Sequence, residues 1–133
     1  MGYRSQVEIL VRGETLLLNV FRAEWIEKAK AMTVPVGVHF LREGQSVVDE
    51  HFNLGEVKNT DAESEWSISF GSIKWYPDYP EIKAYMMILH DCPEQLAAEL
   101  VRVGEEEGDI ETQYGGSGTE DPVLYTSTSI MRY

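Results

Sequence analysis

The sequence has a single cysteine, Cys92, so no disulfide can form within the chain. This usage is typical of a reducing compartment. The chain also lacks any apolar run near the roughly 20 residues that span a bilayer. Its first residues show no basic, apolar and small-residue pattern of a secretory signal. These absences predict a cytoplasmic protein that does not contact a membrane.

Basic residues are scarce, because 11 Lys and Arg stand against 23 Asp and Glu, for a net charge of −12. No basic cluster with interleaved aromatic residues occurs, which argues against direct nucleic-acid binding. Such a surface repels nucleic acid and attracts basic proteins. The alternative is that the acidity serves only solubility.

Metal and cofactor motifs are also missing. His90 and Cys92 form the only close pair of metal-capable residues, whereas a zinc site needs four ligands at tight spacing. Side chains two positions apart on a helix point in different directions, so His90 and Cys92 are not expected to form a catalytic pair either. The glycines at 115–118 have no phosphate-loop lysine, and the acids at 105–111 have no EF-hand pattern. We therefore predict no catalytic residue, no metal and no cofactor.

The sequence does contain enough apolar and aromatic residues to form a hydrophobic core. Hydrophobic residues make up 43% of 133 residues, which predicts one folded domain over 1–133. Trp66, Ile68 and Phe70 alternate with polar residues, as in a strand with one buried face. The alternation slips at residues 71–72 and resumes toward Trp75, which predicts a β-bulge there.

The N-terminal half shows both structural periods. Residues 5–12 alternate as a strand, and 14–30 have helical spacing, with Leu18, Phe21, Trp25 and Ala29 on one side. An alternative hairpin at 12–14 would let Leu16 to Leu18 extend the strand. Pro35 ends the helix. Residues 36–54 then predict a β-hairpin, and 55–65 a polar turn.

The C-terminal half begins with a second helix, which contains Pro80 in its first turn and an Asp78–Glu81 capping interaction. Its buried stripe is Ile82, Tyr85, Met86 and Leu89. The stretch 94–103 fits helix or strand, and we predict a strand at about 98–104. An exposed acidic segment at 105–111, a flexible run at 114–119 and a last strand at 123–131 follow.

This order predicts an α+β fold. The arrangement expected is a ferredoxin-like, split βαβ antiparallel sheet with two helices on one face and extra strands. The other face of the sheet is expected to be partly open, and an apolar open face is a usual place to bind a partner.

Two groups of residues are candidates for contact with a partner protein. The first is the acidic segment, with five carboxylates in seven positions: Glu105, Glu106, Glu107, Asp109 and Glu111. The second is aromatic, Trp75, Tyr76 and Tyr79, because exposed Trp and Tyr are enriched among interface hot spots. The competing interpretations are a solvated acidic loop and ordinary core packing of the aromatics.

Several short strings resemble a group of short acidic proteins encoded by bacteriophages and prophages. They are Met1-Gly2-Tyr3-Arg4-Ser5-Gln6-Val7, Ile73-Lys74-Trp75-Tyr76, Val101-Arg102-Val103-Gly104-Glu105-Glu106 and Asp109-Ile110. The resemblance carries no assigned activity and no site residues. It implies a phage accessory gene expressed in a bacterial cytoplasm. Small acidic phage proteins often bind and block a host protein, sometimes by imitating the charge of DNA.

The sequence therefore favours a non-catalytic acidic module that binds a basic or nucleic-acid-binding host protein. One alternative is a small enzyme or ligand-binding domain that uses the open sheet face or a carboxylate cluster. A structural or oligomerising role through residues 123–133 is the other. The oligomeric state is left open by the sequence.

Overall fold

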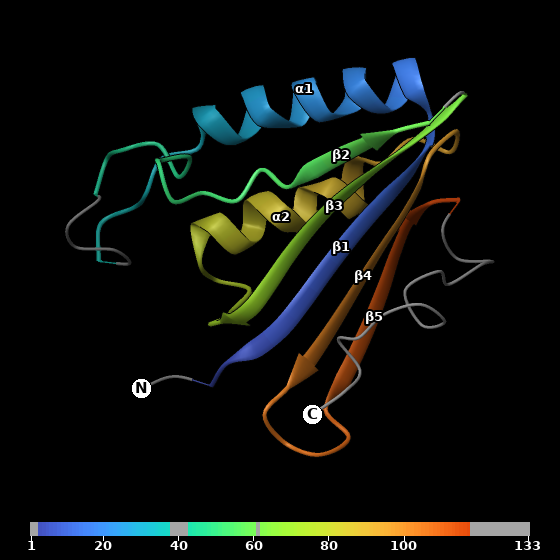
Figure 1. Ribbon diagram of the computed structural model, residues 1–133. Coiled ribbons are helices and arrows are strands. Elements are labelled where there is room, and N and C mark those ends of the chain that lie inside the picture. The colour runs from blue at the N-terminus through green and yellow to red at the C-terminus, as the bar shows by residue number, and fades with distance from the viewer. Residues whose placement is uncertain (1–2, 38–42, 61, 118–133) are drawn as a thin grey trace.

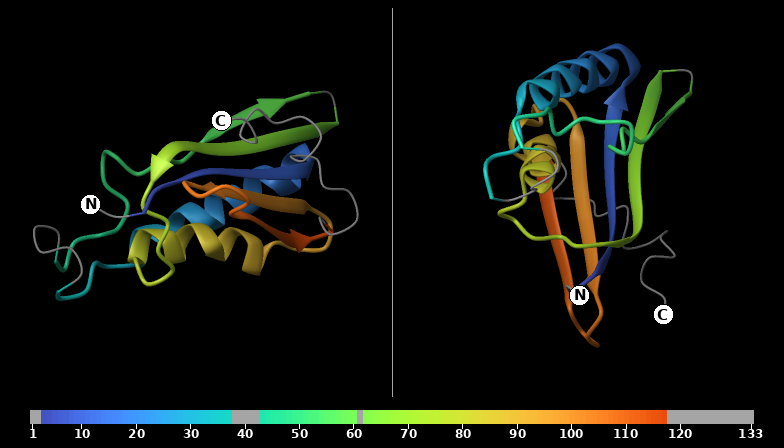
Figure 2. Two further views of the ribbon diagram at one scale, coloured as in Figure 1. Left: turned by 90° about the horizontal axis from the view of Figure 1, so that it is seen from below. Right: turned by 90° about the vertical axis from the view of Figure 1, so that its left-hand side faces the viewer.

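A computed structural model describes residues 3–37, 43–60 and 62–117. It is an α+β structure in which two helices cover one face of a five-stranded sheet (Figures 1 and 2). Every neighbouring strand pair is antiparallel, and the strand order is β2-β3-β1-β4-β5. The elements are β1 (Ser5–Glu14), α1 (Thr15–Ala31), β2 (Glu56–Asn59), β3 (Glu63–Ile73), α2 (Pro80–Asp91), β4 (Ala97–Gly104) and β5 (Ile110–Gly116).

Helix α1 confirms the helical prediction, and the alternative hairpin is wrong. Its four buried residues are the predicted ones, Leu18, Phe21, Trp25 and Ala29, which are spaced by three and four. Glu14 precedes the helix and caps it, because its Oε1 accepts hydrogen bonds from the backbone N–H groups of Leu16 (3.0 Å) and Leu17 (3.4 Å).

The centre of the sheet is the β1–β3 pair, and it contains the predicted bulge. Ser5 lies opposite Ile73 while Val7 lies opposite Phe70, so β3 has one more residue than β1 in this interval. Before the bulge, Trp66 and Ile68 of β3 are buried under the helices together with Val7, Ile9 and Val11 of β1. The bulge therefore redirects the last residues of β3 as they leave the sheet.

The predicted hairpin over 36–54 is wrong. Residues 38–42 lie outside the described part of the chain, Val36 is in a turn and 79% exposed, and 48–54 have no strand pairing. Side-chain turns account for this: Asp49 Oδ1 accepts a hydrogen bond from His51 N (2.9 Å), and Asn53 Oδ1 from Gly55 N (2.8 Å). Such local bonds compete with a strand ladder.

Strand β2 instead forms within the segment predicted as a polar turn. It pairs with β3, and beyond its end Thr60 N donates to Glu63 O (2.8 Å) at the start of β3. Only Val57 of its four residues packs against the core. A single apolar residue leaves no alternation to recognise, so the pairing depends on β3.

Helix α2 starts with Pro80 at its first position, as predicted, but the predicted capping pair is wrong. Tyr79 precedes the helix and makes no side-chain capping bond. Ile82, Tyr85 and Leu89 are buried as predicted, and Met86 is partly buried. Trp25 Nε1 of α1 donates to the Ala84 carbonyl oxygen (2.7 Å), which links the two helices.

Strand β4 confirms the strand prediction at 98–104, and residues 105–108 are exposed as predicted, but the run predicted as flexible at 114–119 belongs to a strand up to Gly116. Residues 105–108 form the turn, and β5 begins at Ile110 and runs through Tyr114 and Gly115. Gly115 lets β5 approach α2, because a Cβ there would overlap the backbone of Leu89. The predicted strand at 123–131 lies outside the described residues.

Candidate functional site

The two predicted groups of partner-binding residues meet at one end of the sheet, where β1 begins and β4 ends. Tyr3 joins them. Its backbone N–H donates to Tyr76 Oη (2.6 Å), and its hydroxyl donates to Asp109 Oδ2 (2.5 Å). The same hydroxyl oxygen accepts the backbone N–H of Glu106 (2.9 Å). One residue thus connects the aromatic segment, through its backbone, to the acidic turn, through its hydroxyl.

Arg102 lies at the centre of this end. It continues the face of β4 that carries the core residues Ala98 and Leu100, and its side chain is only 17% exposed. Its Nε donates to Glu111 Oε1 (2.8 Å), directly across the β4–β5 pair, and its Nη2 to Asp109 Oδ1 (3.0 Å).

The remaining nitrogen of the guanidinium, Nη1, contacts Ser5 Oγ (3.1 Å) and Asp109 Oδ2 (3.3 Å). We refer to Tyr3, Ser5, Arg102, Asp109 and Glu111 as the Arg102 network. Four hydrogen bonds thus occupy a group with five N–H donors.

The charges in the network stabilise one another. Hydrogen bonds from Arg102, and then from Tyr3, lower the pKa of Asp109. The hydrogen bond to Asp109 is the main reason that the pKa of Tyr3 is raised. Partial burial tends to lower the pKa of Arg102, but its bonds to Asp109 and Glu111 outweigh burial and raise it. The network thus pairs the Arg102 guanidinium with the carboxyl groups of Asp109 and Glu111.

Gly104 makes room for this arrangement. A Cβ at this position would overlap Asp109 Oδ2 and the hydroxyl of Tyr3. The backbone N–H of Gly104 also donates to the Asp109 carbonyl oxygen (2.8 Å), which closes the turn between β4 and β5. A glycine at the end of β4 is therefore a condition for the close approach of Tyr3 and Asp109.

A cleft of about 400 Å³ opens beside the network. One wall is aromatic and apolar and comes from the β3–α2 connection and from α2, while the other is polar and comes from β4 and β5. The lining residues are Tyr3, Trp75, Tyr76, Pro77, Ile82, Met86, Arg102, Asp109, Glu111 and Gln113. The site is thus an open cleft in which polar groups from β4, from β5, from the turn between them and from Tyr3 converge next to aromatic rings.

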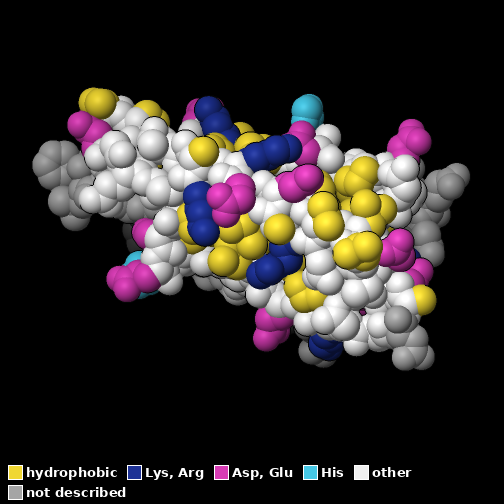
Figure 3. All heavy atoms as spheres, turned by 90° about the horizontal axis from the view of Figure 1, so that it is seen from above, with side chains coloured by type: hydrophobic (Ala, Val, Ile, Leu, Met, Phe, Trp, Pro, Cys, Tyr) yellow, Lys and Arg dark blue, Asp and Glu magenta, His cyan; other side chains and the backbone are white. Residues whose placement is uncertain are grey.

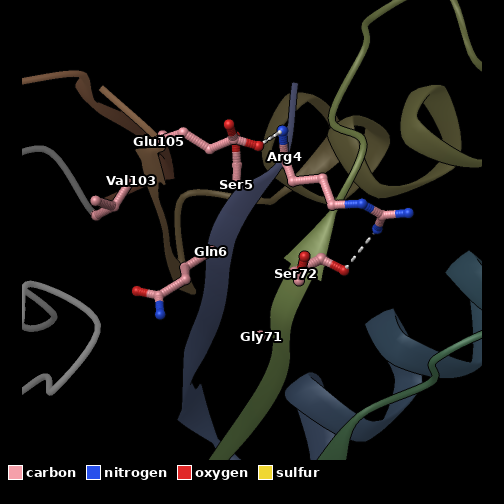
Figure 4. Close-up of a pocket in the computed structure, with 8 residues that line it drawn as sticks. Arg4, Ser5, Gln6, Gly71, Ser72, Val103 and Glu105 are labelled. Atoms are coloured by element: carbon pink, nitrogen blue, oxygen red, sulfur yellow. Dashed lines mark hydrogen bonds between the residues drawn. The ribbon is translucent and has the colours of Figure 1, made fainter. Parts of the chain in front are cut away.

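Glu105, at the same end of the sheet, makes a hydrogen bond to the residue that precedes β1. Its Oε2 accepts the backbone N–H of Arg4 (2.6 Å), and Arg4 Nη1 reaches the Ser72 carbonyl oxygen (3.4 Å) at the bulge (Figure 4). These residues line a second hollow of about 310 Å³. Glu105 therefore fastens the turn to the start of β1, while the side chains of Glu106 and Glu107 are exposed.

The three predicted aromatic residues have different roles. Trp75 is 8% exposed and packs near Phe70 and Tyr85, so most of its surface belongs to the core. Tyr76 lines the cleft and is half-buried. Tyr79 packs edge-on against Tyr76 with ring centroids 5.2 Å apart, and it does not line the cleft.

Sequence reasoning missed Tyr3, Arg102 and Gln113 as parts of the site. A signal for Arg102 was present: it is the only Lys or Arg between Lys83 and Arg132, and it lies in a strand otherwise rich in apolar residues. A lone cation there requires carboxylate partners. Tyr3 had no comparable signal, because its partners lie 73 and 106 positions away.

A third hollow, of about 290 Å³, lies beside Phe52 and Tyr85. Phe52 stacks on Tyr85 with centroids 4.8 Å apart, and the Tyr85 hydroxyl both accepts from Asn53 N (2.9 Å) and donates to Asn53 O (2.8 Å). Burial raises the pKa of Tyr85. These contacts are those of core packing.

Comparisons with known proteins leave the site to be interpreted from its own geometry: no family model, curated protein or solved structure matches this chain. Within residues 3–37, 43–60 and 62–117, no group of three or more His, Cys, Asp or Glu side chains could hold a metal ion. Over the same ranges, neither helix is long and apolar enough to cross a membrane.

Proposed function

We propose that this protein is a non-catalytic binding module that engages a basic protein through the end of the sheet that holds the Arg102 network. The observation that carries this proposal is the contact of Tyr3 with both Tyr76 and the 105–109 turn. Aromatic anchors and exposed carboxylates in one place are the elements of a surface that binds cations.

The distribution of charge supports the same end. The turn presents Glu106 and Glu107 to solvent, whereas Asp109 and Glu111 bind Arg102. On the opposite, α1 side of the molecule, Lys and Arg side chains alternate with Asp and Glu around apolar patches (Figure 3). Such a mixed surface attracts neither sign strongly, so attraction for a basic partner would concentrate at the turn.

We further propose a ferredoxin-like, split βαβ core for β1 to β4 with β5 added at one edge. The β2-β3-β1-β4 order and the antiparallel pairs support this interpretation. The resemblance to phage proteins adds the proposal that the protein acts in a bacterial cytoplasm on a host protein.

The test is a binding experiment on a bacterial lysate with the immobilised protein. We expect a basic or nucleic-acid-binding protein to be retained at low salt and released as salt rises. The variant Glu106→Gln/Glu107→Gln should retain about tenfold less of it, because rim charges act mainly on encounter and salt dependence. Glu24→Gln/Glu43→Gln is the matched control, since both residues are exposed and lie in other segments.

Retention of nothing at low salt, or an equal loss in both double variants, would refute the proposal. Duplex DNA provides a further arm. If the protein imitates DNA, a duplex of arbitrary sequence should displace the retained partner in proportion to its concentration. Because Glu106→Gln/Glu107→Gln holds the partner less tightly, less DNA should displace the partner from this variant.

A further inference from the structure

We infer that the cleft beside the Arg102 network is a receptor for one lysine or arginine side chain of the partner. This inference rests on the proposed function and specifies which feature of the basic partner is recognised. The cleft combines an aromatic wall with two carboxylates, and both surfaces favour a cation with an aliphatic stem.

The carboxylates have capacity left for such a group. Glu111 is 40% exposed, and its two oxygens accept hydrogen bonds from Arg102 Nε and from Gln113 Nε2 (2.5 Å). A carboxylate has about four lone-pair sites. Glu111 can therefore accept an ammonium or guanidinium group without releasing Arg102, whose own bonds hold the carboxylate in place.

An anionic ligand fits this cleft poorly. Among the described residues, Arg102 is the only cation that lines it, and four of its five donors are engaged by Ser5, Asp109 and Glu111. To bind an anion, Arg102 would have to leave its partners and uncover two carboxylates beside the ligand. The charge of the cleft thus selects a cation.

The apolar wall selects the kind of cation. Pro77, Ile82 and Met86 line the cleft next to Tyr76. The methylene stem of a lysine or arginine can lie along these side chains while its charged head reaches Glu111. A bare metal ion makes no use of that wall, and a neutral apolar side chain leaves Glu111 without a new partner.

Three probe peptides test the inference: acetyl-Gly-Gly-Lys-Gly-Gly-amide and its arginine and norleucine counterparts. Each is titrated into 15N-labelled protein while the signals of Arg102 Nε–H, the Trp75 indole and the Gln113 side-chain amide are followed. We expect saturable shifts of these signals with the lysine and arginine peptides, and at least tenfold weaker binding of the norleucine peptide.

Two variants locate the contact. Glu111→Gln keeps the shape of the side chain and should weaken the lysine peptide about tenfold, and Tyr76→Leu, which removes the ring, should also weaken it. Glu24→Gln on α1 makes the same charge change outside the cleft and should leave the affinity unchanged. The backbone signals of each variant report whether it has folded.

The outcomes separate this inference from the proposed function. A basic partner retained from lysate with no cleft signal responding to any peptide overturns the inference and leaves the proposed function standing. Equal binding of the norleucine peptide, or equal weakening by Glu24→Gln, also overturns it. Cleft binding of the lysine or arginine peptide supports the inference even where no partner is retained, in which case the proposed function fails.

Discussion

At the scale of single residues, Arg102 illustrates how a partly buried charge is kept in an acidic protein. Burial of a cation is costly, and the cost is offset only when hydrogen-bonding carboxylates lie within reach. Asp109 and Glu111 meet that need from the turn and from the neighbouring strand. The residues predicted as acidic contacts for a partner are therefore divided between internal partners and solvent.

Cys92 is a second residue whose environment has a measurable consequence. It is half-buried at the end of α2, and burial raises the pKa of its thiol to about 11. An ordinary thiol has a pKa of about 8.5. Because the folded value is the higher one, the stability contributed by the neutral thiol is intact below about pH 8.5 and is lost as pH rises toward 11.

We accordingly predict slow alkylation of the folded protein. At pH 8 the reaction with iodoacetamide should be about 100-fold slower in buffer than in denaturant, since far less thiolate is present. The native rate should rise about tenfold per pH unit until pH approaches 11. The denatured chain is the control, because it has the same single thiol. A native rate that levels off near pH 8.5 would contradict the raised pKa.

At the scale of elements, β5 shows how one close contact can define a strand. The segment is acidic and contains consecutive glycines, Gly115 and Gly116, which gave it the pattern of a loop. Its pairing with β4 and the approach of Gly115 to the end of α2 override that pattern. β5 in turn carries Glu111 and Gln113 into the cleft.

Gly115→Ala should therefore destabilise the protein by about 1–3 kcal/mol, the usual cost of forcing atoms into a packed site. The neighbouring atoms belong to the helix backbone at Leu89 and cannot rotate away. Gly71→Ala is the matched control: Gly71 is exposed, and a Cβ added there would meet no atom within 4 Å. Urea unfolding should show little change for Gly71→Ala. Equal effects of the two substitutions would mean that β5 does not approach α2.

At the scale of the whole molecule, the net charge of −12 opposes compaction. The described ion pairs at the surface, such as Lys28–Asp91 and Lys30–Glu27, are exposed and contribute little. General repulsion among the carboxylates should outweigh them. Salt, which screens charges over about 10 Å at 0.1 M, should then stabilise the fold.

We predict that Tm rises by several degrees when NaCl is increased from about 0.01 M to about 0.3 M at pH 7, a range over which screening becomes effective. Differential scanning calorimetry provides the measurement. Glu24→Lys/Glu43→Lys, which makes the net charge markedly less negative, should raise Tm at low salt and reduce the response to salt. A Tm that falls with added salt would instead show that ion pairs dominate.

Local sequence patterns were sufficient to predict an element where that element buries one face. Helix α1, the paired core of β1 and β3 and the bulge at residues 71–72 follow from the spacing of apolar residues, because period and phase are read within ten to fifteen positions. Strand β4 followed instead from the strand-like residue types of Leu100 to Val103, although its first residues also had helix propensity. The acidic turn and the aromatic segment could be named individually from composition.

The proximity of the acidic turn to the aromatic segment was decided only by the tertiary structure. Strand β2 forms because it hydrogen-bonds to β3, and β5 forms because it pairs with β4 and packs against α2. Side-chain turns at Asp49 and Asn53 replace the expected strand. Tyr3 reaches Tyr76 and Asp109 across most of the chain. Periodicity carries no information about such distant partners. The sequence by itself thus determined the acidity, the helices and the central strands, while long-range pairing placed the acidic turn beside the aromatic wall.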